Sequence, residues 1–375
     1  MISLGIFTLI ALSVFFSFYM TSESHKEKEP ETIVVKKPEP SFAETKLASM
    51  TLRQKVASLL ILHASGSDVA TLGKFLIDYQ PSGLIFMPDN IGSMTSAELG
   101  VVTTQLQIDP ELPYLFAIDE EGGTVQRLIE DSFPSALDLK TQPADATETA
   151  FSDRSAMLKQ AGMNLNFGII ADITDNPSSF IYPRVLGIDP TNSSDRVAAA
   201  VRGEKGNVIS TLKHYPGHGE TTGDSHYSIP VTDISYQQWQ DRDEKPFVSG
   251  IKAGAQFVMF GHLTYSAVDS LPASLSIKWH DIIRQRDNFK GIIITDDMLM
   301  LQQSGLSEYS DPIKNAVNAI NAGNTVLLYV LGSDSIAPND LIDGIVSAVD
   351  DGTISQDIIN INVKQVLELR HGLVK

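Results

Sequence analysis

Eight short apolar runs recur along the chain, and a longer segment with helical spacing or loop composition separates each run from the next. The runs show little alternation of apolar and polar residues, which is typical of strands that are covered on both faces in a parallel sheet. Eight β/α units in about 330 residues predict a (β/α)8 barrel of the TIM type, within the α/β class. The runs lie at residues 59–64, 83–88, 114–119, 165–173, 208–215, 257–263, 291–297 and 325–331.

A doubly wound open sheet has the same local pattern and is the alternative fold. The nucleotide-binding form of that fold carries a GxGxxG motif after an early strand, and no such motif follows the early runs in this sequence. Crossover helices are expected in either fold. Residues 67–80 and 311–323 have the apolar spacing of helices, and Gly323 closes the second of them.

The N-terminus begins with an apolar segment, residues 1–22, that carries no charged side chain. About 20 apolar residues suffice for a helix to cross a bilayer, so this segment is predicted to be a membrane anchor. A cleaved signal peptide and a buried helix are the alternatives, but the basic start of a signal peptide is missing. Residues 23–41 combine Glu, Lys and Pro and predict a solvated linker. The barrel domain should then span residues 42–375.

Composition disfavours several classes of function. The chain has 28 Lys and Arg against 46 Asp and Glu, for a formal charge of -18, and no basic patch interrupts this balance. Nucleic acid is therefore a poor candidate partner. The sequence has no cysteine, which excludes disulfides, zinc thiolate sites and a cysteine nucleophile. We expect a monomer that uses no cofactor.

Polar side chains gather at the C-terminal ends of the apolar runs. In a barrel these ends meet on a single rim, where the active sites of this fold are found. Strand ends are also where chains generally become polar, but that explanation suits one or two such residues better than the whole set. The residues are Asp119, Asp172, Lys213 with His214, His262, and Asp296 with Asp297.

The segment 213–226, KHYPGHGETTGDSH, collects three histidines, a lysine, a glutamate and an aspartate. Pro216 lies between His214 and His218, so these histidines cannot share a helical face as the ligands of an HExxH zinc site do. A zinc site is disfavoured, and we expect no metal. A GxSxG nucleophile motif is absent from the sequence. The remaining alternative is a structural loop whose histidines pack against carbonyl groups.

This segment resembles the signature of glycoside hydrolase family 3. KHYPGHG followed by four residues and DSH is similar to the single-domain β-N-acetylglucosaminidase branch of that family. The resemblance extends over about residues 44–332 and implies a barrel with glycosidase activity. Four further stretches resemble family landmarks in the expected order: MTLRQKVASLLI, IDEEGGTVQRL, NLNFGIIADI with YPRVLG, and GIIITDDMLM.

The resemblance implies a retaining mechanism, in which a carboxylate attacks the anomeric carbon and a second group protonates the leaving oxygen. It assigns the nucleophile to Asp296. Asp297 would then cap a helix or orient its neighbour, and the residues alone separate these two aspartates only weakly. The resemblance assigns the acid/base to His226, with Asp224 bonded to the other ring nitrogen so that it fixes the tautomer.

The resemblance also implies a set of sugar-binding residues with the mixture of donors and acceptors that suits a polyol. Each has a structural alternative: Arg127 could pair with Glu121, for example, and Asp119 could cap a turn. The implied sugar-binding residues are Asp119, Arg127, Arg184, Lys213 and His214.

The expected function is hydrolysis of terminal β-N-acetylglucosamine from cell-wall fragments or chitin oligomers. A phosphorylase of the same family is one alternative. A catalytically silent, membrane-tethered glycan-binding protein is another, although a pure binder has no need of a nucleophile. Lys26 and Lys28 follow the predicted anchor and favour a cytoplasmic domain under the positive-inside rule. A cell-wall substrate favours the outer face, which is where we expect the barrel.

Overall fold

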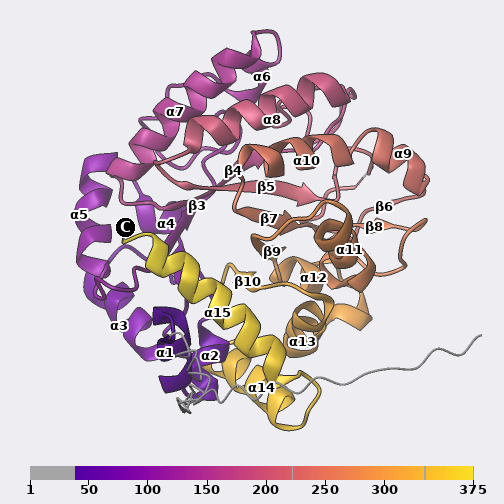
Figure 1. The fold of residues 1–375 in the computed structure, drawn as a ribbon. Helices are drawn as coiled ribbons and strands as arrows, with labels where there is room; N and C mark the ends of the chain where they lie inside the picture. The colour runs from indigo at the N-terminus through magenta and orange to yellow at the C-terminus, as the bar shows by residue number, and fades with distance from the viewer. Residues whose placement is uncertain (1–38, 222, 333–334, 375) are drawn as a thin grey trace, which may run out of the picture. The chain divides into compact units, whose positions relative to one another are not determined.

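The computed structural model describes residues 39–221, 223–332 and 335–374, and within them eight parallel strands close into a barrel (Figure 1). Each of the eight apolar runs contains one strand, because a strand buried on both faces needs apolar residues at successive positions. The strands are β1 (Leu60–Leu62), β2 (Gly83–Ile85), β3 (Leu115–Ile118), β4 (Leu165–Ile170), β5 (Ile209–Tyr215), β7 (Phe257–Phe260), β9 (Ile292–Asp297) and β10 (Val326–Tyr329).

Closure of the sheet distinguishes the two predicted folds. On one side β1 pairs with β10, with Leu60 opposite Leu327, and on the other it pairs with β2, with Ile61 opposite Gly83. The first strand therefore has no open edge. The prediction of a (β/α)8 barrel is confirmed, and the alternative of an open, doubly wound sheet is wrong.

A second, two-stranded parallel sheet was not predicted. It consists of β6 (Val231–Thr232) and β8 (Thr264–Tyr265), which lie in the segments that follow β5 and β7. Strands of two residues carry too little periodicity to be recognised in a sequence.

Helices form the outer layer around the barrel (Figure 1). Asp311 caps the predicted helix within 311–323 and Gly323 ends it, as the sequence indicated. Two 3-10 helices, η1 (Ala273–Leu275) and η3 (Ser307–Tyr309), and one π-helix, η2 (Ile282–Arg286), occur in the connections. The α-helices are α1 (Phe42–Ser49), α2 (Leu52–Ala57), α3 (Val69–Tyr79), α4 (Pro88–Ile91), α5 (Ser96–Leu106), α6 (Ala136–Leu139), α7 (Ala144–Gln160), α8 (Pro190–Glu204), α9 (Tyr236–Asp241), α10 (Glu244–Ala253), α11 (Ile277–Asp281), α12 (Leu299–Gln303), α13 (Pro312–Ala322), α14 (Pro338–Asp350) and α15 (Gln356–Gly372).

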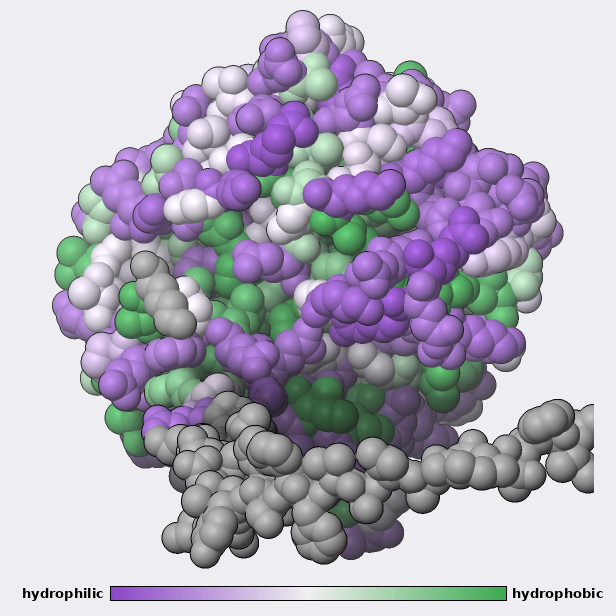
Figure 2. Space-filling model, viewed as in Figure 1, coloured by the Kyte–Doolittle hydropathy of each residue, from purple (hydrophilic) through white to green (hydrophobic). Residues whose placement is uncertain are grey.

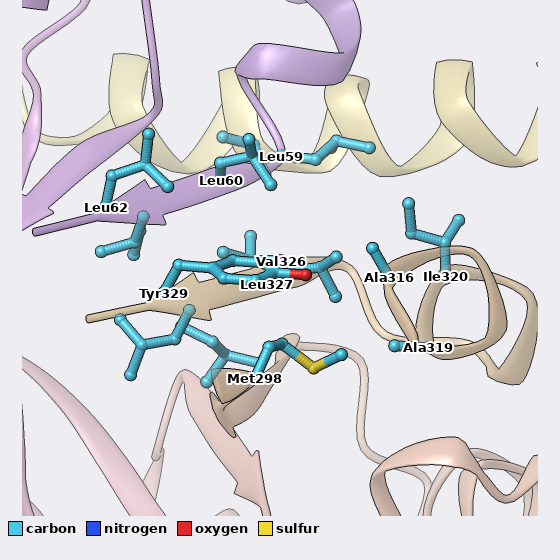
Figure 3. Close-up of a cluster of buried hydrophobic side chains, with 14 of the residues drawn as sticks. Leu59, Leu60, Leu62, Met298, Ala316, Ala319, Ile320, Val326, Leu327 and Tyr329 are labelled. Atoms are coloured by element: carbon cyan, nitrogen blue, oxygen red, sulfur yellow. The ribbon is translucent and has the colours of Figure 1, made fainter. Parts of the chain in front are cut away.

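The strand β10 illustrates how the core is built (Figure 3). Its side chains Val326, Leu327 and Tyr329 are buried between residues of β1 and of α13. Met298, which follows β9, packs in the same cluster. Each fully buried side chain of this size stabilises the fold by about 1.5–3 kcal/mol relative to exposure. The partners labelled in Figure 3 are Leu59, Leu60, Leu62, Ala316, Ala319 and Ile320.

Residues 1–38, which hold the predicted anchor and nearly all of the predicted linker, lie outside the described residues. The first described helix, α1, begins at Phe42 with Ser41 as its cap. In the part of the chain that the structure covers, no helix is both long and apolar enough to cross a membrane. On the face shown in Figure 2 hydrophilic side chains predominate, in keeping with the formal charge of -18.

The last helix, α15, offers a matched test of how its inner face stabilises the barrel. Ile359 is fully buried (0% exposed), whereas Ile361 on the same helix is 67% exposed. Ile359→Ala should lower the free energy of unfolding by about 2–5 kcal/mol, because it leaves a cavity. Ile361→Ala, which makes the same change in helix propensity, should alter it by less than about 0.5 kcal/mol. Urea unfolding measures both variants, and equal losses would contradict this account of α15.

Candidate active site

Strands of the barrel deliver ionisable side chains to one rim. Most of these side chains come from segments far apart in the sequence, and the barrel geometry brings the C-terminal ends of the strands together. Asp119 follows β3, Asp172 follows β4, Lys213 and His214 lie in β5, His262 follows β7, and Asp296 with Asp297 ends β9.

Lys213 is the centre of a charge cluster on this rim. Its Nζ lies 2.7 Å from a carboxylate oxygen of Asp119 and 2.9 Å from one of Glu121. Arg184 donates two hydrogen bonds of 2.8 Å to Glu121, from Nε and Nη2. Arg127 lies 3.5 Å from Asp119. The alternative in which Arg127 pairs with Glu121 is therefore wrong, because Arg184 and Lys213 occupy that carboxylate.

Glu121 and Lys213 keep their charges despite being buried. Burial by itself would raise the pKa of Glu121, but the charges of Arg184 and Lys213 outweigh it and hold that pKa at about 2. Burial would likewise lower the pKa of Lys213, but Asp119 and Glu121 outweigh it and raise the pKa above its ordinary value. The rim therefore presents fixed cationic donors and anionic acceptors side by side, an arrangement that can bind the hydroxyl groups of a sugar.

Asp172 is a fully buried carboxylate that positions the start of the loop after β5. It accepts a hydrogen bond of 2.6 Å from the backbone N–H of His218 and lies 2.8 Å from Nδ1 of His214. The backbone N–H of His214 also points to both of its oxygens, at 3.2 Å. Burial opposes the charge of Asp172, but these histidines and their hydrogen bonds hold its pKa below the ordinary value. Asp172 therefore orients His214 and leaves its Nε2 free.

The two adjacent aspartates at the end of β9 have different environments. Asp297 Oδ1 accepts hydrogen bonds from the backbone N–H groups of Leu299, at 3.1 Å, and Val330, at 3.0 Å. Burial raises the pKa of Asp297 to about 7. Burial opposes the charge of Asp296 as well, but nearby His214, His262 and Lys213 lower its pKa below the ordinary value. Asp296 is thus the ionised carboxylate, and Asp297 is bound by the backbone.

His262 supports this end of β9 from the neighbouring strand. Its Nε2 lies 2.9 Å from the carbonyl oxygen of Asp297, and its Nδ1 lies 2.7 Å from Oγ of Ser274. A carbonyl can only accept, so Nε2 carries the proton and Nδ1 accepts from the serine hydroxyl. Burial lowers the pKa of His262, which keeps the ring neutral.

Asp224 and His226 form a pair in the loop after β5. Nδ1 of His226 lies 2.7 Å from Oδ1 of Asp224, and the backbone N–H of His226 donates to the same oxygen at 3.0 Å. Burial would raise the pKa of Asp224, but these hydrogen bonds and the charge of His226 lower it. The His226 side chain is 57% exposed. Its Nε2 is therefore available to a ligand, while Asp224 holds the other nitrogen.

The pair has its own hydrogen bonds, separate from those of the charge cluster. Among the described residues, no hydrogen bond or ion pair joins Asp224 or His226 to Asp296 or Lys213. A cavity of about 430 Å³ lies beside Asp224, and residues of the segments 174–180 and 219–221 line it. A ligand that contacted both the rim and the Asp224–His226 pair could place one of its groups in this cavity.

Three side chains that help to build the site were given no catalytic or binding role from the sequence. Asp172 and His262 carried a signal, because both follow apolar runs, but the family resemblance assigned them no role. Glu121 was considered only as a partner of Arg127. Its actual partners, Arg184 and Lys213, are far from it in the sequence, so no local pattern could reveal the cluster.

Within residues 39–221, 223–332 and 335–374, no group of three or more His, Asp and Glu side chains is arranged to hold a metal ion. His214 and His218 illustrate the reason. Asp172 orients the first, and the second is buried with Nδ1 2.7 Å from Oγ1 of Thr221.

Residues 51–369 match the model of the glycosyl hydrolase family 3 N terminal domain. A β-hexosaminidase from Psychromonas ingrahamii is 36% identical over 224 residues, covering 57% of this chain and 65% of that protein. A β-hexosaminidase from Idiomarina loihiensis is 30% identical over 282 residues, covering 73% of this chain and 83% of that protein. The chain therefore spans a little under two thirds of the Psychromonas protein and a larger part of the Idiomarina protein.

Solved structures resemble the barrel over most of its length. A glycoside hydrolase family 3 β-N-acetylglucosaminidase from Paenibacillus has a TM-score of 0.80 and 28% identity, covering 87% of this chain and 63% of that one. A β-N-acetylhexosaminidase from Beutenbergia cavernae, at 24% identity, has the same fold, with a TM-score of 0.76 over 86% of this chain and 99% of that one.

The charge of Glu121 should make stability depend on pH. Its pKa is lowered from an ordinary 4.5 to about 2, so its contribution is complete above the unfolded value and is lost as the pH falls through about 2. Glu121→Gln should cost about 3 kcal/mol at neutral pH, because Arg184 and Lys213 lose a buried partner. The deficit should shrink as the pH falls from about 5 towards 2.

Chemical unfolding at several pH values measures this deficit. Glu148→Gln is the matched control, since Glu148 pairs with Arg202 at 2.8 Å on the exposed surface. That control should lose less than about 1 kcal/mol. A deficit for Glu121→Gln that stayed constant with pH would show that its charge is not the stabilising feature.

Proposed function

The chain belongs to glycosyl hydrolase family 3, and from this premise we propose that it is a retaining β-N-acetylhexosaminidase that removes terminal β-N-acetylglucosamine from cell-wall fragments or chitin oligomers. The β-hexosaminidase and β-N-acetylglucosaminidase names of its relatives support this activity. The observation that carries the proposed mechanism is the difference between the two aspartates at the end of β9.

Asp296 is the proposed nucleophile. A carboxylate that attacks an anomeric carbon must be ionised and must keep an oxygen free. Nearby His214, His262 and Lys213 lower the pKa of Asp296. Among the described residues, its Oδ1 accepts the N–H of Asp297 at 2.8 Å and its other oxygen accepts no hydrogen bond. Asp297 is less suited, because burial raises its pKa and two backbone N–H groups occupy its Oδ1.

His226 is the proposed acid/base, with Asp224 as its orienting partner. An imidazole titrates near neutral pH, so it can protonate the leaving oxygen and then accept a proton from the attacking water. The contact between Nδ1 and Asp224 leaves Nε2 as the atom that would exchange protons with the substrate. The cavity beside Asp224 has room for the leaving group.

The charge cluster is the proposed binding site for the terminal sugar. Lys213 and Arg184 are held by Asp119 and Glu121, so their donors are fixed before the substrate arrives. Donors that need no reorganisation bind at lower entropic cost. Arg127 and His214 would complete the set from the same rim.

A phosphorylase of the same family is the second candidate function. A histidine acid is neutral after it has donated its proton, so it would not repel an approaching phosphate as a carboxylate would. Chromogenic β-N-acetylglucosaminide, β-glucoside and β-xyloside substrates, assayed with and without phosphate, test the proposal. Equal rates on all three sugars would contradict the acetamido preference, and a sugar 1-phosphate as main product would replace hydrolysis by phosphorolysis.

The two aspartates provide a matched pair of variants. Asp296→Asn should lower kcat by about 10³-fold or more, because an amide cannot form the glycosyl ester. Asp297→Asn should keep most of its turnover, because an amide oxygen can still accept from Leu299 and Val330. Mass spectrometry after reaction with a 5-fluoro sugar identifies the labelled residue. A label on Asp297 would overturn the assignment of the nucleophile.

The acid role of His226 predicts a dependence on the leaving group. General acid catalysis contributes about 10²–10⁴-fold, and an activated phenol needs little of it. His226→Ala should therefore slow substrates with poor leaving groups far more than activated aryl substrates. Asp224→Ala should show a weaker form of the same pattern, since it removes only tautomer control. An equal loss on all leaving groups would remove His226 from this role.

A further inference from the structure

The loop that carries Asp224 and His226 has both of its ends bound to one short strand, β8. At the entrance, the phenol of Tyr265 donates a hydrogen bond of 2.6 Å to the carbonyl oxygen of Gly217. At the exit, the backbone N–H of Thr264 donates to the carbonyl of Pro230 at 2.8 Å. The parallel pairing of β8 with β6 follows directly, with Thr264 opposite Val231. Two consecutive residues of β8 thus close the loop.

The entrance contact is buried and closely packed. Tyr265 is 1% exposed, and its ring lies edge-on to Trp279 with centroids 5.4 Å apart. Gly217 has a φ of 131°, a backbone conformation that favours glycine. An added Cβ would lie 3.1 Å from the Cβ of Asp243, so the backbone of Gly217 packs closely against Asp243. A buried carbonyl left without its donor costs free energy, and Tyr265 is therefore a strong determinant of the position of Gly217.

Other groups bind the entrance from different directions. The indole Nε1 of Trp239 donates to the carbonyl of Pro216 at 2.8 Å. On the inner side, Asp172 accepts from the backbone N–H of His218 at 2.6 Å. The carboxylate of Glu220 contacts the guanidinium of Arg242. At the exit, the hydroxyl of Ser266 donates to the carbonyl of Thr232 at 3.2 Å and adds to the pairing with β8.

We propose that Tyr265 is a positioning residue for the acid/base pair, because its hydroxyl ties the entrance of the loop to the strand that also holds the exit. The catalytic consequence rests on the proposed function of His226. Proton transfer requires a separation of about 2.6–3.2 Å between heavy atoms, and a loop whose entrance has lost one buried hydrogen bond holds such a separation less well. Without the hydroxyl, the nucleophile and the sugar-binding cluster remain in the barrel while the position of the pair becomes less defined.

Tyr265→Phe tests this with the removal of one oxygen atom. It should lower kcat by about tenfold for substrates with poor leaving groups and by less than about twofold for activated aryl substrates, with an unchanged KM. Tyr114→Phe is the matched control, since its buried hydroxyl also donates to a carbonyl, that of Leu76 at 3.5 Å, next to the N-terminal end of β3. Tyr114→Phe should leave kcat unchanged for both classes of substrate. Equal losses on both classes of substrate with Tyr265→Phe would overturn the positioning role.

A double mutant identifies the residue through which Tyr265 acts. In a His226→Ala background, Tyr265→Phe should cause no further loss, because two changes that affect the same step are not additive. An unchanged tenfold loss in that background would show that Tyr265 acts on another part of the site and would also overturn the proposal.

A third measurement does not depend on activity. Backbone amide hydrogen exchange of residues 217–230 should accelerate in Tyr265→Phe and not in Tyr114→Phe, because only the first variant removes a hydrogen bond from the entrance of the loop. Unchanged exchange in Tyr265→Phe would show that the Tyr265 hydroxyl does not hold the entrance of the loop in place. An inactive wild-type protein with accelerated exchange in the variant would refute the proposed function while the structural role of Tyr265 stood.

Discussion

The pairing of β1 with both β2 and β10 is the constraint on which the rest of the molecule depends. An open sheet would have left the first and last strands at opposite edges. Closure instead brings the C-terminal ends of all eight strands to one rim. Closure also curves the sheet, so that the carboxylates at the ends of β3, β4 and β9 and the Lys213 ammonium of β5 lie around one rim.

The rim carries buried charged side chains, and burying any one of them without its partners would cost free energy. Lys213 and Glu121 are both nearly excluded from water, and burial opposes the charged form of each. Their mutual contact, with Arg184 beside Glu121 and Asp119 beside Lys213, reverses that effect and keeps both ionised. A buried ion pair is not strong evidence of net stabilisation, since the desolvation of the partners offsets the attraction. These ion pairs instead hold charged groups in fixed positions where a polar ligand would bind.

The proposed chemistry is divided between a rigid part and a tethered part. Asp296 ends a strand of the barrel, so the barrel itself fixes its position. His226 and Asp224 lie in a loop outside the barrel, and their position depends on contacts at the two ends of that loop. Catalysis with retention needs the two groups on opposite sides of one bond. The proposed mechanism therefore requires the loop to place His226 on the side of the bond opposite Asp296.

The sequence alone determined the eight strands and the strand-end residues, because burial on both faces imposes continuous apolar runs that can be read locally. It also placed Asp224 next to His226, since a contact between residues two positions apart is local. Closure of the sheet, which separates the barrel from the open alternative, was decided by the pairing of β1 with β10 in the tertiary structure. The pairing of Glu121 with Arg184, the difference between Asp296 and Asp297, and the tie from Tyr265 to Gly217 were decided only by the tertiary structure. Each depends on burial and on partners brought from distant segments, and those quantities leave no periodic trace in a sequence.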